Sequence, residues 1–266
     1  MKKTAFERPT GHLNISQSKK ILEKEANPVV IELQNVSKVV RTGGIVKKKT
    51  KIILDNISFQ IRRNEHTAIL GANGAGKTTL VEIICGLNKP TSGKIFYNLG
   101  STNFKSKIGV QFQETSYPSN LSVADVVKFV TKLYNISLTN NPLLKKLIDI
   151  FEIKKIYHKN ITFLSGGEAQ RVNVMLSLFH KPEILFLDEL STGLDIKIRT
   201  RIKHFIKNYA DQNKITIIIV SHDVEEIGYI TNHIIFLKNG QKVIDTTKDL
   251  LIREYGSFVN FFDKSI

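Results

Sequence analysis

The sequence predicts an α/β fold with a mostly parallel sheet, and three observations support that prediction. An apolar strand pattern at 67–70 leads into a glycine-rich stretch, 71–78, and a helical pattern follows it. Two further apolar runs, 184–187 and 215–220, end in polar or acidic residues, which is typical of parallel strands whose carboxyl ends surround a ligand. Residues 115–170 carry helical patterns without a strand pattern, so we expect a helical insert there.

The composition suits one large domain rather than a fibrous or disulfide-stapled chain. The 266 residues are 41% hydrophobic and 24% charged, which is enough to bury a substantial core. The net charge of +15 comes from lysines spread along the whole chain without a long basic run. This favours a general lysine bias, so no nucleic-acid partner is expected. The single Cys85 lies in an apolar helical stretch, where core packing is expected.

The N-terminal residues 1–28 are polar and mixed in charge, and we expect a loosely ordered tail with one short helix around 16–25. They lack the apolar core of a secretory signal. The longest apolar runs are far shorter than the roughly 20 residues of a spanning helix. The sequence therefore predicts a cytoplasmic protein, whose membrane role would come through a partner.

Strand patterns at 29–33 and 52–61 precede the glycine-rich stretch. Between them, the basic segment 41–51 is expected to form a solvated loop that turns at Gly43-Gly44. Contact of this loop with anionic lipid headgroups is a less favoured alternative. Behind the glycine-rich stretch, 94–97 and 107–110 are expected to be short strands.

The helical insert is expected to open on a capping box formed by Ser122 and Asp125. The apolar face of this first helix would consist of Val126, Val127, Phe129, Val130 and Leu133. A second helix is expected at 143–151. Near the C-terminus, 234–244 is predicted to be a hairpin that turns at Asn239-Gly240.

The stretch 71–78, Gly-Ala-Asn-Gly-Ala-Gly-Lys-Thr, fits the phosphate-loop pattern G-x-x-x-x-G-K-[ST] at every defined position. Its glycines let backbone N–H groups wrap around an anion, and the following helix points the positive end of its dipole at the phosphates. Lys77 is expected to reach the β- and γ-phosphates of a nucleotide, and the Thr78 hydroxyl to ligate Mg²⁺. The alternative is a glycine-rich turn that matches the pattern by chance.

An acid pair, Asp188-Glu189, ends the 184–187 run. Asp188 is expected to hold Mg²⁺ through water, and Glu189 to polarise the attacking water molecule. The alternative is an ordinary exposed strand end. His222 follows the 215–220 run and is a candidate sensor of the γ-phosphate, although a lone histidine in a turn is usually only solvated. The other six histidines are expected to be solvated.

These motifs resemble those of ATP-binding cassette (ABC) ATPases from about residue 29 to residue 244. The resemblance adds a Q-loop glutamine at Gln113, a signature Leu-Ser-Gly-Gly-Glu at 164–168 and a D-loop at 191–195, all in the family's order. It implies the ABC ATPase fold: a P-loop NTPase core with an antiparallel β subdomain and a helical subdomain at about 115–170. The ABC ATPase domain would span 29–250, with a short extension at 251–266.

The resemblance also implies the roles of individual residues. Glu189 and His222 would be catalytic, and Thr78, Gln113 and Asp188 would hold Mg²⁺. The ATP contacts would come from Gly71, Ala72, Asn73, Gly74, Ala75, Gly76, Lys77, Thr78, Thr79, Gln113, Ser165, Gly166, Gly167 and Glu168. Two ATP molecules would be trapped between this chain and a second ABC ATPase subunit, packed head to tail.

The function implied is the ATP-hydrolysing subunit of an ABC transporter, peripheral on the inner face of the cell membrane through a membrane-spanning partner on another chain. The segments 113–118, 121–123 and 132–134 look like those of stand-alone exporter ATPases, which favours export. An importer ATPase subunit and a soluble ATPase of the iron–sulfur assembly type are the alternatives. A nucleotide-regulated module without turnover would need Glu189 or His222 to be missing.

The chain departs from the family pattern at two positions. Val40 stands where the family usually has an aromatic residue that stacks on adenine, so nucleotide selectivity is expected to be loose. Glu168 stands where glutamine is commoner in the signature, and this change is expected to be tolerated.

Overall fold

The structure, a computed structural model, describes residues 27–42, 49–100, 103–112 and 117–265. The N-terminal tail expected at 1–28 falls almost wholly outside these ranges. The turn expected at Gly43-Gly44 and the Q-loop residue Gln113 also lie outside the described residues.

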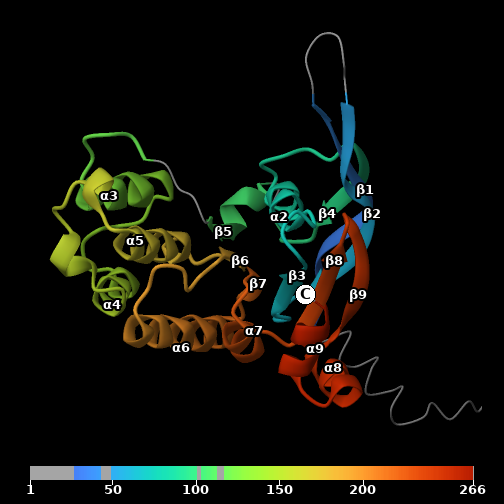
Figure 1. Cartoon of the computed structure of the whole chain (residues 1–266). Coiled ribbons are helices and arrows are strands. Elements are labelled where there is room, and N and C mark those ends of the chain that lie inside the picture. Colours follow the sequence, from blue (N-terminus) through green and yellow to red (C-terminus); the bar gives the residue numbers. More distant parts are fainter. Residues whose placement is uncertain (1–26, 43–48, 101–102, 113–116, 266) are drawn as a thin grey trace, which may run out of the picture.

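A six-stranded sheet forms the centre of the molecule, in the order β5-β6-β7-β3-β8-β9 (Figure 1). The neighbouring strands run parallel except for the antiparallel pair β8 and β9. The sheet consists of β3 (Thr67–Leu70), β5 (Ile108–Gln111), β6 (Ile184–Asp188), β7 (Thr216–Val220), β8 (His233–Lys238) and β9 (Gln241–Thr247). The predicted mostly parallel sheet is confirmed. Because β3, β6 and β7 are parallel, the loops that follow them start at the same end of the sheet, where the C-termini of these strands lie.

A smaller antiparallel sheet, in the order β2-β1-β4, packs beside the central one. It consists of β1 (Val29–Thr42), β2 (Lys49–Arg62) and β4 (Ser92–Tyr97). Helix α2 (Lys77–Ile84) joins the two sheets, because its Leu80 and Ile83 share one core with Leu54 of β2 and Ile218 of β7. The expected antiparallel β subdomain is therefore present.

The helical insert lies on the far side of the central sheet from the antiparallel sheet (Figure 1). Its main helices are α3 (Val123–Leu133), α4 (Pro142–Ile150) and α5 (Gly166–Leu178), with single turns η2 (Ile153–Ile156) and η3 (Ile161–Phe163) between them. Another turn, η1 (Phe104–Lys107), precedes β5. Phe151 of this insert and Leu187 of β6 belong to one buried cluster, so the insert packs onto the sheet rather than standing apart.

Four more helices follow the acid pair: α6 (Ile196–Asn213), α7 (Val224–Ile230), α8 (Lys248–Tyr255) and α9 (Phe258–Ser265). The boundary expected at residue 250 falls inside α8. Phe258 and Phe261 of α9 are buried in the same core as the helical insert. Within the described residues, no helix combines the length and the apolar character needed to cross a membrane.

The basic segment 41–51 differs from the solvated loop expected there. Arg41 and Thr42 belong to β1, and Lys49, Thr50 and Lys51 belong to β2, with Val40 directly opposite Lys51. The hairpin projects from the body of the molecule (Figure 1). Its described residues at 49–52 are exposed, so no buried face imposes an apolar alternation that the sequence would reveal.

The first helix of the insert opens on the expected capping box, since Ser122 and Asp125 exchange side-chain and backbone hydrogen bonds. Its apolar face was predicted too broadly. Val126 and Val127 are buried, but Phe129 is 66% exposed and Leu133 is 65% exposed. These two residues, four apart on α3, point away from the core, and Leu133 lines an apolar groove.

Candidate active site

The glycine-rich loop leaves β3 and closes on the first turn of α2. At Gly71, φ is +146°, and a Cβ atom would lie far inside van der Waals contact with the Leu237 carbonyl oxygen. At Gly76, φ is +100°, and a Cβ atom would lie 2.7 Å from Leu54 Cδ2. Both defined glycines of the phosphate-loop pattern are thus required by backbone conformation and by crowding.

Lys77 is held inside the loop. Its Nζ atom donates hydrogen bonds to the Gly71 carbonyl at 2.7 Å and to the Ala72 carbonyl at 3.2 Å. Burial lowers the pKa of Lys77 from its usual value, while the negative charges of Glu189 and Asp188 oppose this shift. The ammonium group therefore sits in a partly desolvated position, where its attraction for an anion is strong.

A cavity of about 290 Å³ opens along the loop and brings together residues far apart in the sequence. Its lining comprises Lys51, Ile53, Asn73, Gly74, Gly76, Lys77, Thr78, Thr79, Asp188, Val220 and His222. Of the expected nucleotide contacts in the loop, Gly71, Ala72 and Ala75 do not line it. Ala72 and Ala75 face a separate cavity of about 250 Å³ against the end of β8.

The acid pair lies where the C-terminal end of β6 meets this cavity. Asp188 is 6% exposed, and its burial, together with the Glu189 charge, raises the pKa of Asp188 to about 6. Glu189 has φ of +58°, and its backbone N–H donates to the Val220 carbonyl at 2.9 Å. Its carboxylate lies 3.7 Å from His222 Nε2, so the acid and the histidine expected to act together do face each other.

Two buried glutamines missed by the sequence analysis hold the backbone of the acid pair. Gln111, at the end of β5, donates to the Asp188 carbonyl at 2.9 Å. Gln170, on α5, donates to the Glu189 carbonyl at 2.9 Å and to the Leu190 carbonyl at 3.1 Å. These bonds fix the direction in which the two carboxylates leave the strand. No local pattern marks either glutamine, because the partners lie 77 and 19–20 residues away.

A buried acid, Glu226 on α7, was also missed. It is 1% exposed and accepts a short hydrogen bond from the Ser191 hydroxyl. Burial raises the pKa of Glu226 above its ordinary value. The contact links the segment after Glu189 to the helix after His222.

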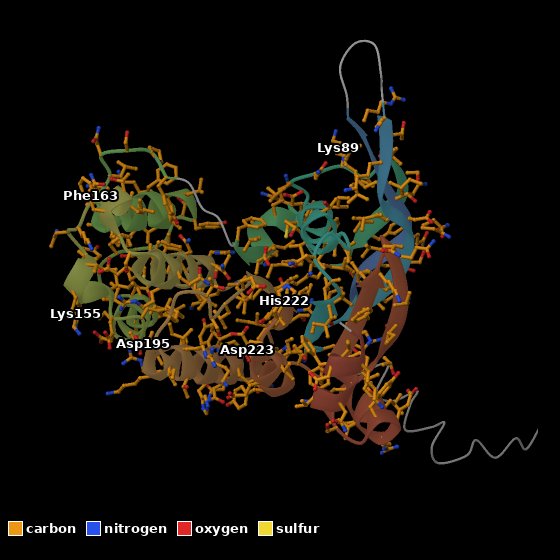
Figure 2. All side chains as sticks on the ribbon, viewed as in Figure 1. Lys89, Lys155, Phe163, Asp195, His222 and Asp223 are labelled. Carbon is orange, nitrogen blue, oxygen red and sulfur yellow. The ribbon has the colours of Figure 1, made fainter. Side chains whose placement is uncertain are left out.

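The signature residues do not join this cavity. Ser165 caps α5, its hydroxyl accepting from the Glu168 N–H at 3.3 Å, while the Glu168 carboxylate accepts from the Ser165 N–H at 2.8 Å and from Lys159 Nζ at 2.7 Å. Figure 2 shows Phe163, which precedes this turn, on the helical insert and well apart from His222. The structure thus keeps the signature and the phosphate loop of one chain separate.

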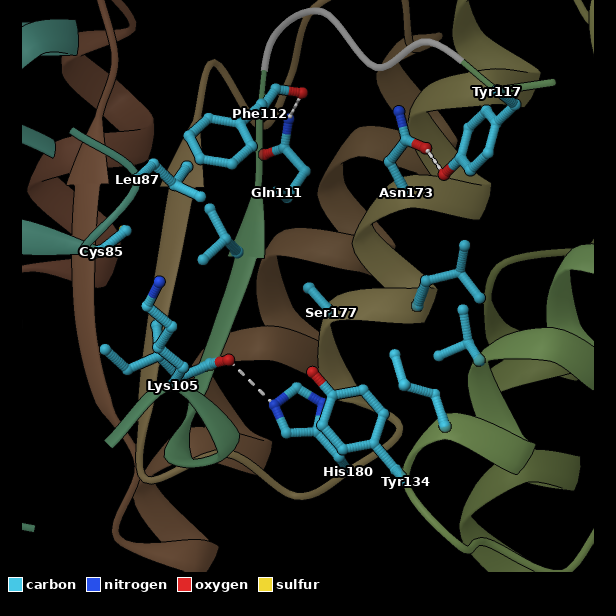
Figure 3. A pocket seen from close by; sticks show the side chains of 15 residues that line it. Cys85, Leu87, Lys105, Gln111, Phe112, Tyr117, Tyr134, Asn173, Ser177 and His180 are labelled. Carbon is cyan, nitrogen blue, oxygen red and sulfur yellow. Dashed lines mark hydrogen bonds between the residues drawn. The ribbon is translucent and has the colours of Figure 1, made fainter. Parts of the chain in front are cut away.

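A mainly apolar groove of about 360 Å³ lies between the segments at the end of α2 and η1 on one side and helices α3 and α5 of the helical insert on the other (Figure 3). Leu87 and Lys105 lie on one side and Tyr134 on the other, and Leu133, the residue before Tyr134, also lines the groove. Its floor includes the end of β5 and Phe112, next to the segment that carries Gln113. The groove therefore reaches the end of β5, where Gln111 contacts the Asp188 carbonyl.

The expectation that the remaining histidines are solvated is wrong for three of them. His66 is 3% exposed, and its Nε2 atom lies 2.9 Å from an Asp211 carboxylate oxygen. His233 is 8% exposed and lies 3.0 Å from Asp245. His180 stacks on Tyr134 with ring centroids 4.2 Å apart, and burial lowers its pKa. Each is packed among tertiary neighbours that the local sequence does not show.

The donor set fits Mg²⁺. The Thr78 hydroxyl and the Asp188 carboxylate line the same cavity and are hard oxygen ligands of the kind Mg²⁺ prefers. Within the described ranges, no cluster of three or more His, Cys, Asp or Glu side chains could hold a metal by itself. Mg²⁺ usually takes one or two protein ligands and is otherwise coordinated by phosphate oxygens and water.

The raised pKa of Asp188 gives a first testable prediction. When the pKa of a carboxyl group is higher in the folded protein than in the unfolded chain, the protein loses stability as the pH rises through the pKa of the folded state. In the absence of nucleotide and magnesium, Asp188→Asn should therefore raise the free energy of unfolding by on the order of 1–2 kcal/mol at pH 8. The gain should shrink toward pH 5, as measured by denaturant titration. Asp263→Asn, at an exposed position on α9, should change little, and an equal gain at both pH values would contradict the prediction.

Comparisons with known proteins agree with this geometry. The family model described as ABC transporter matches residues 54–192. The energy-coupling factor transporter ATP-binding protein EcfA2 of Thermotoga maritima is 32% identical over 234 residues, which cover 85% of both chains. The spermidine/putrescine import ATP-binding protein PotA of Clostridium acetobutylicum is 31% identical over 242 residues, which cover 88% of this chain and 66% of that protein.

Among solved structures, a dimeric, post-hydrolysis state of an ATP-binding cassette bound to ADP and phosphate superposes with a TM-score of 0.72. It is 25% identical, and the superposition covers 82% of this chain and 98% of that chain. The expected ABC ATPase fold is therefore confirmed.

Proposed function

The chain belongs to the ABC transporter family of ATP-binding proteins, and we propose that it hydrolyses ATP to drive import through a membrane-spanning partner on another chain. The observation that carries this proposal is the cavity in which Lys77, Thr78, Asp188 and His222 converge, with Glu189 at its edge. A phosphate loop, a buried carboxylate and a neighbouring acid–histidine pair are the parts that nucleotide hydrolysis requires.

Each residue in the cavity has a distinct role in this proposal. Lys77 and the loop N–H groups hold the β- and γ-phosphates, and Thr78 with Asp188 would hold Mg²⁺. When bound, the metal neutralises charge on the phosphates. Glu189 accepts a proton from the attacking water molecule, and His222 orients the γ-phosphate and the Glu189 carboxylate, which lies 3.7 Å away.

A second copy or a related cassette completes the site. Ser165 and Gly167 lie at the N-terminus of α5, where the positive end of the helix dipole suits an anion, but they do not line the cavity of their own chain. Gly167 packs so closely against Gly193 that a Cβ atom would collide with the Gly193 carbonyl. The signature is thus tied to the D-loop. Head-to-tail pairing would bring the signature of one chain over the phosphate loop of the other.

The direction of transport is proposed as import, and the expectation of export is not supported. PotA is named as an import protein. A comparison of cell contents tests the direction. Cells that lack the chain should be depleted of the transported solute, whereas loss of an exporter would make that solute accumulate.

The groove in Figure 3 is the proposed docking site for the membrane partner. Its walls carry Leu87 and Leu133, which are 62% and 65% exposed, and nearby Phe129 is 66% exposed. An apolar segment of a membrane protein would cover these side chains and reach the end of β5 and Phe112 at the floor. A displacement of the groove floor by the partner would reach Asp188 through the Gln111 side chain, which donates to the Asp188 carbonyl.

Purification of the tagged full chain from its native membranes in mild detergent tests this proposal. A polytopic membrane protein should co-purify in stoichiometric amount. Leu133→Glu should reduce its recovery about tenfold or more, because a charge would be buried in the contact. Leu250→Glu is the matched control, since Leu250 is 52% exposed on α8, away from the groove. Recovery of the parent chain without a membrane partner would favour a soluble ATPase instead.

A further inference from the structure

One wall of the nucleotide cavity comes from the antiparallel sheet. Lys51 and Ile53 of β2 line it beside Thr78 and Thr79. All the lining residues belong to the described part of the chain, and none of them is Phe, Tyr or Trp; the one ring, His222, lies at the opposite end of the cavity from β2, beside Glu189. The side chains available to contact a base from this wall are therefore aliphatic or cationic.

Strand β2 is fixed against the phosphate loop at this wall. A Cβ atom at Gly76 would lie only 2.8 Å from the Ile53 carbonyl oxygen, so the two backbones are in close contact. The Asp55 N–H donates to the Gly240 carbonyl at 2.8 Å, and the Gly240 N–H donates to the Ala75 carbonyl at 3.2 Å. These contacts hold Ile53, and with it Lys51, at a set position relative to the loop.

Val40 extends this wall on the neighbouring strand. It pairs directly with Lys51, and side chains at directly opposed positions of an antiparallel pair lie about 4.5–5.5 Å apart at Cβ. Val40 is 37% exposed, so its side chain remains available for contact. Val40 does not itself line the cavity, but it lies beside Lys51 at the border of the cavity. We term Lys51 and Ile53, together with the neighbouring Val40 of β1, the β2 wall; it offers two branched aliphatic groups and one ammonium group.

The position of the β2 wall assigns it to the nucleoside end of the cavity. Asp188 and His222 come from the ends of β6 and β7 and surround the place of the γ-phosphate. Lys51 and Ile53 come from the other sheet, so the cavity extends from the ends of the central strands to β2. A nucleotide whose γ-phosphate lies near Asp188 and His222 would have its base near the β2 wall.

We propose that Lys51, supported by Val40 and Ile53, holds the purine base through its ammonium group and aliphatic contact, without aromatic stacking, and that adenine and guanine nucleotides bind similarly. The inference rests on the proposed nucleotide-hydrolysing function. Both purines offer acceptors to an ammonium group, N7 in adenine and N7 with O6 in guanine. A flexible ammonium group and branched aliphatic side chains do not read the exocyclic groups that distinguish the two bases.

Calorimetric binding of MgADP, MgGDP and pyrophosphate to the full chain tests the proposal, since these ligands are not hydrolysed at the site. ADP and GDP should bind within about threefold of each other, because no polar partner is committed to one base. Lys51→Met should weaken both nucleotides on the order of fivefold, as expected for loss of one hydrogen bond at an exposed position. It should leave pyrophosphate binding unchanged. Lys51→Arg, which keeps the cation, should retain most of the affinity.

Lys94→Met is the matched control, because Lys94 is an exposed lysine of the same small sheet that does not line the cavity. Unchanged ADP affinity in Lys51→Met would overturn the inference while leaving the proposed function intact. Equal weakening of ADP and pyrophosphate would also overturn it, because Lys51 would then act on the phosphates. A strong preference for ADP over GDP in the parent chain would likewise overturn the inference. Failure of the parent chain to bind ADP at all would instead contradict the proposed function.

Discussion

Replacing Glu189 by glutamine should lower ATP turnover by about 10²–10⁴-fold, the contribution of a positioned general base. Glutamine has the same shape, so the backbone bonds of Glu189 to Val220 and Gln170 should survive. Only the capacity to accept a proton is lost. Nucleotide affinity should change little, because Lys77 and Thr78 remain. Phosphate release by the chain in its membrane complex measures turnover, and calorimetry with MgADP measures binding.

The matched control is Glu254→Gln, which removes the same charge at an exposed position on α8. It should leave turnover at the parent level. If Glu189→Gln hydrolysed ATP within about threefold of the parent rate, well short of a general base's contribution, Glu189 would not be the base. The Glu189 carboxylate beside His222 would then have a role other than accepting the proton.

Replacing Gly71 by alanine should have the largest effect on the fold around the site. Alanine at φ of +146° would place Cβ against the Leu237 carbonyl, and a backbone atom cannot move aside as a flexible side chain can. Backbone strain and overpacking each cost about 1–3 kcal/mol, so a loss of roughly 2–5 kcal/mol in the free energy of unfolding is expected. Nucleotide binding should fall with it, because Lys77 is anchored to the Gly71 carbonyl.

Gly74→Ala provides the comparison within the same loop. Gly74 also has positive φ, at +79°, but nothing lies within 4 Å of a Cβ atom built there. Its cost should be limited to the strain of left-handed backbone, about 1–2 kcal/mol. Denaturant unfolding of the two variants separates crowding from backbone strain. Equal losses at Gly71 and Gly74 would show that the contact with Leu237 relaxes easily.

The strands and motifs that follow a local pattern could be predicted from the sequence. The 67–70 strand, the phosphate loop and the start of α2 depend on residues within a short stretch, since the required glycines and Lys77 are adjacent in the chain. The same holds for the capping box at Ser122 and for the hairpin at Asn239-Gly240. In the phosphate loop, the capping box and the hairpin, the hydrogen bonds join near neighbours, so a short stretch of sequence contains both partners. The 67–70 strand pairs with distant strands, and only its apolar run is visible locally.

Other features depend on contacts between distant segments. The predicted apolar face of α3 was too broad because a helical pattern shows which residues are apolar but not where the packing partner ends. Phe129 and Leu133 lie beyond that limit. The strand content of the basic hairpin was missed because its exposed faces impose no alternation on residues such as Lys49 and Lys51.

The sequence by itself determined the family, the phosphate loop and the order of the acid pair and His222, because these reside in contiguous residues whose chemistry is tied to short spacings. Only the tertiary structure decided which side chains share a cavity. It separated the signature from the phosphate loop, brought Gln111 and Gln170 to the backbone of the acid pair, and placed Lys51 beside Thr78 and Thr79. The reason is physical: strand register and sheet packing set these distances, and they depend on burial summed over the whole core rather than on any local run of residues.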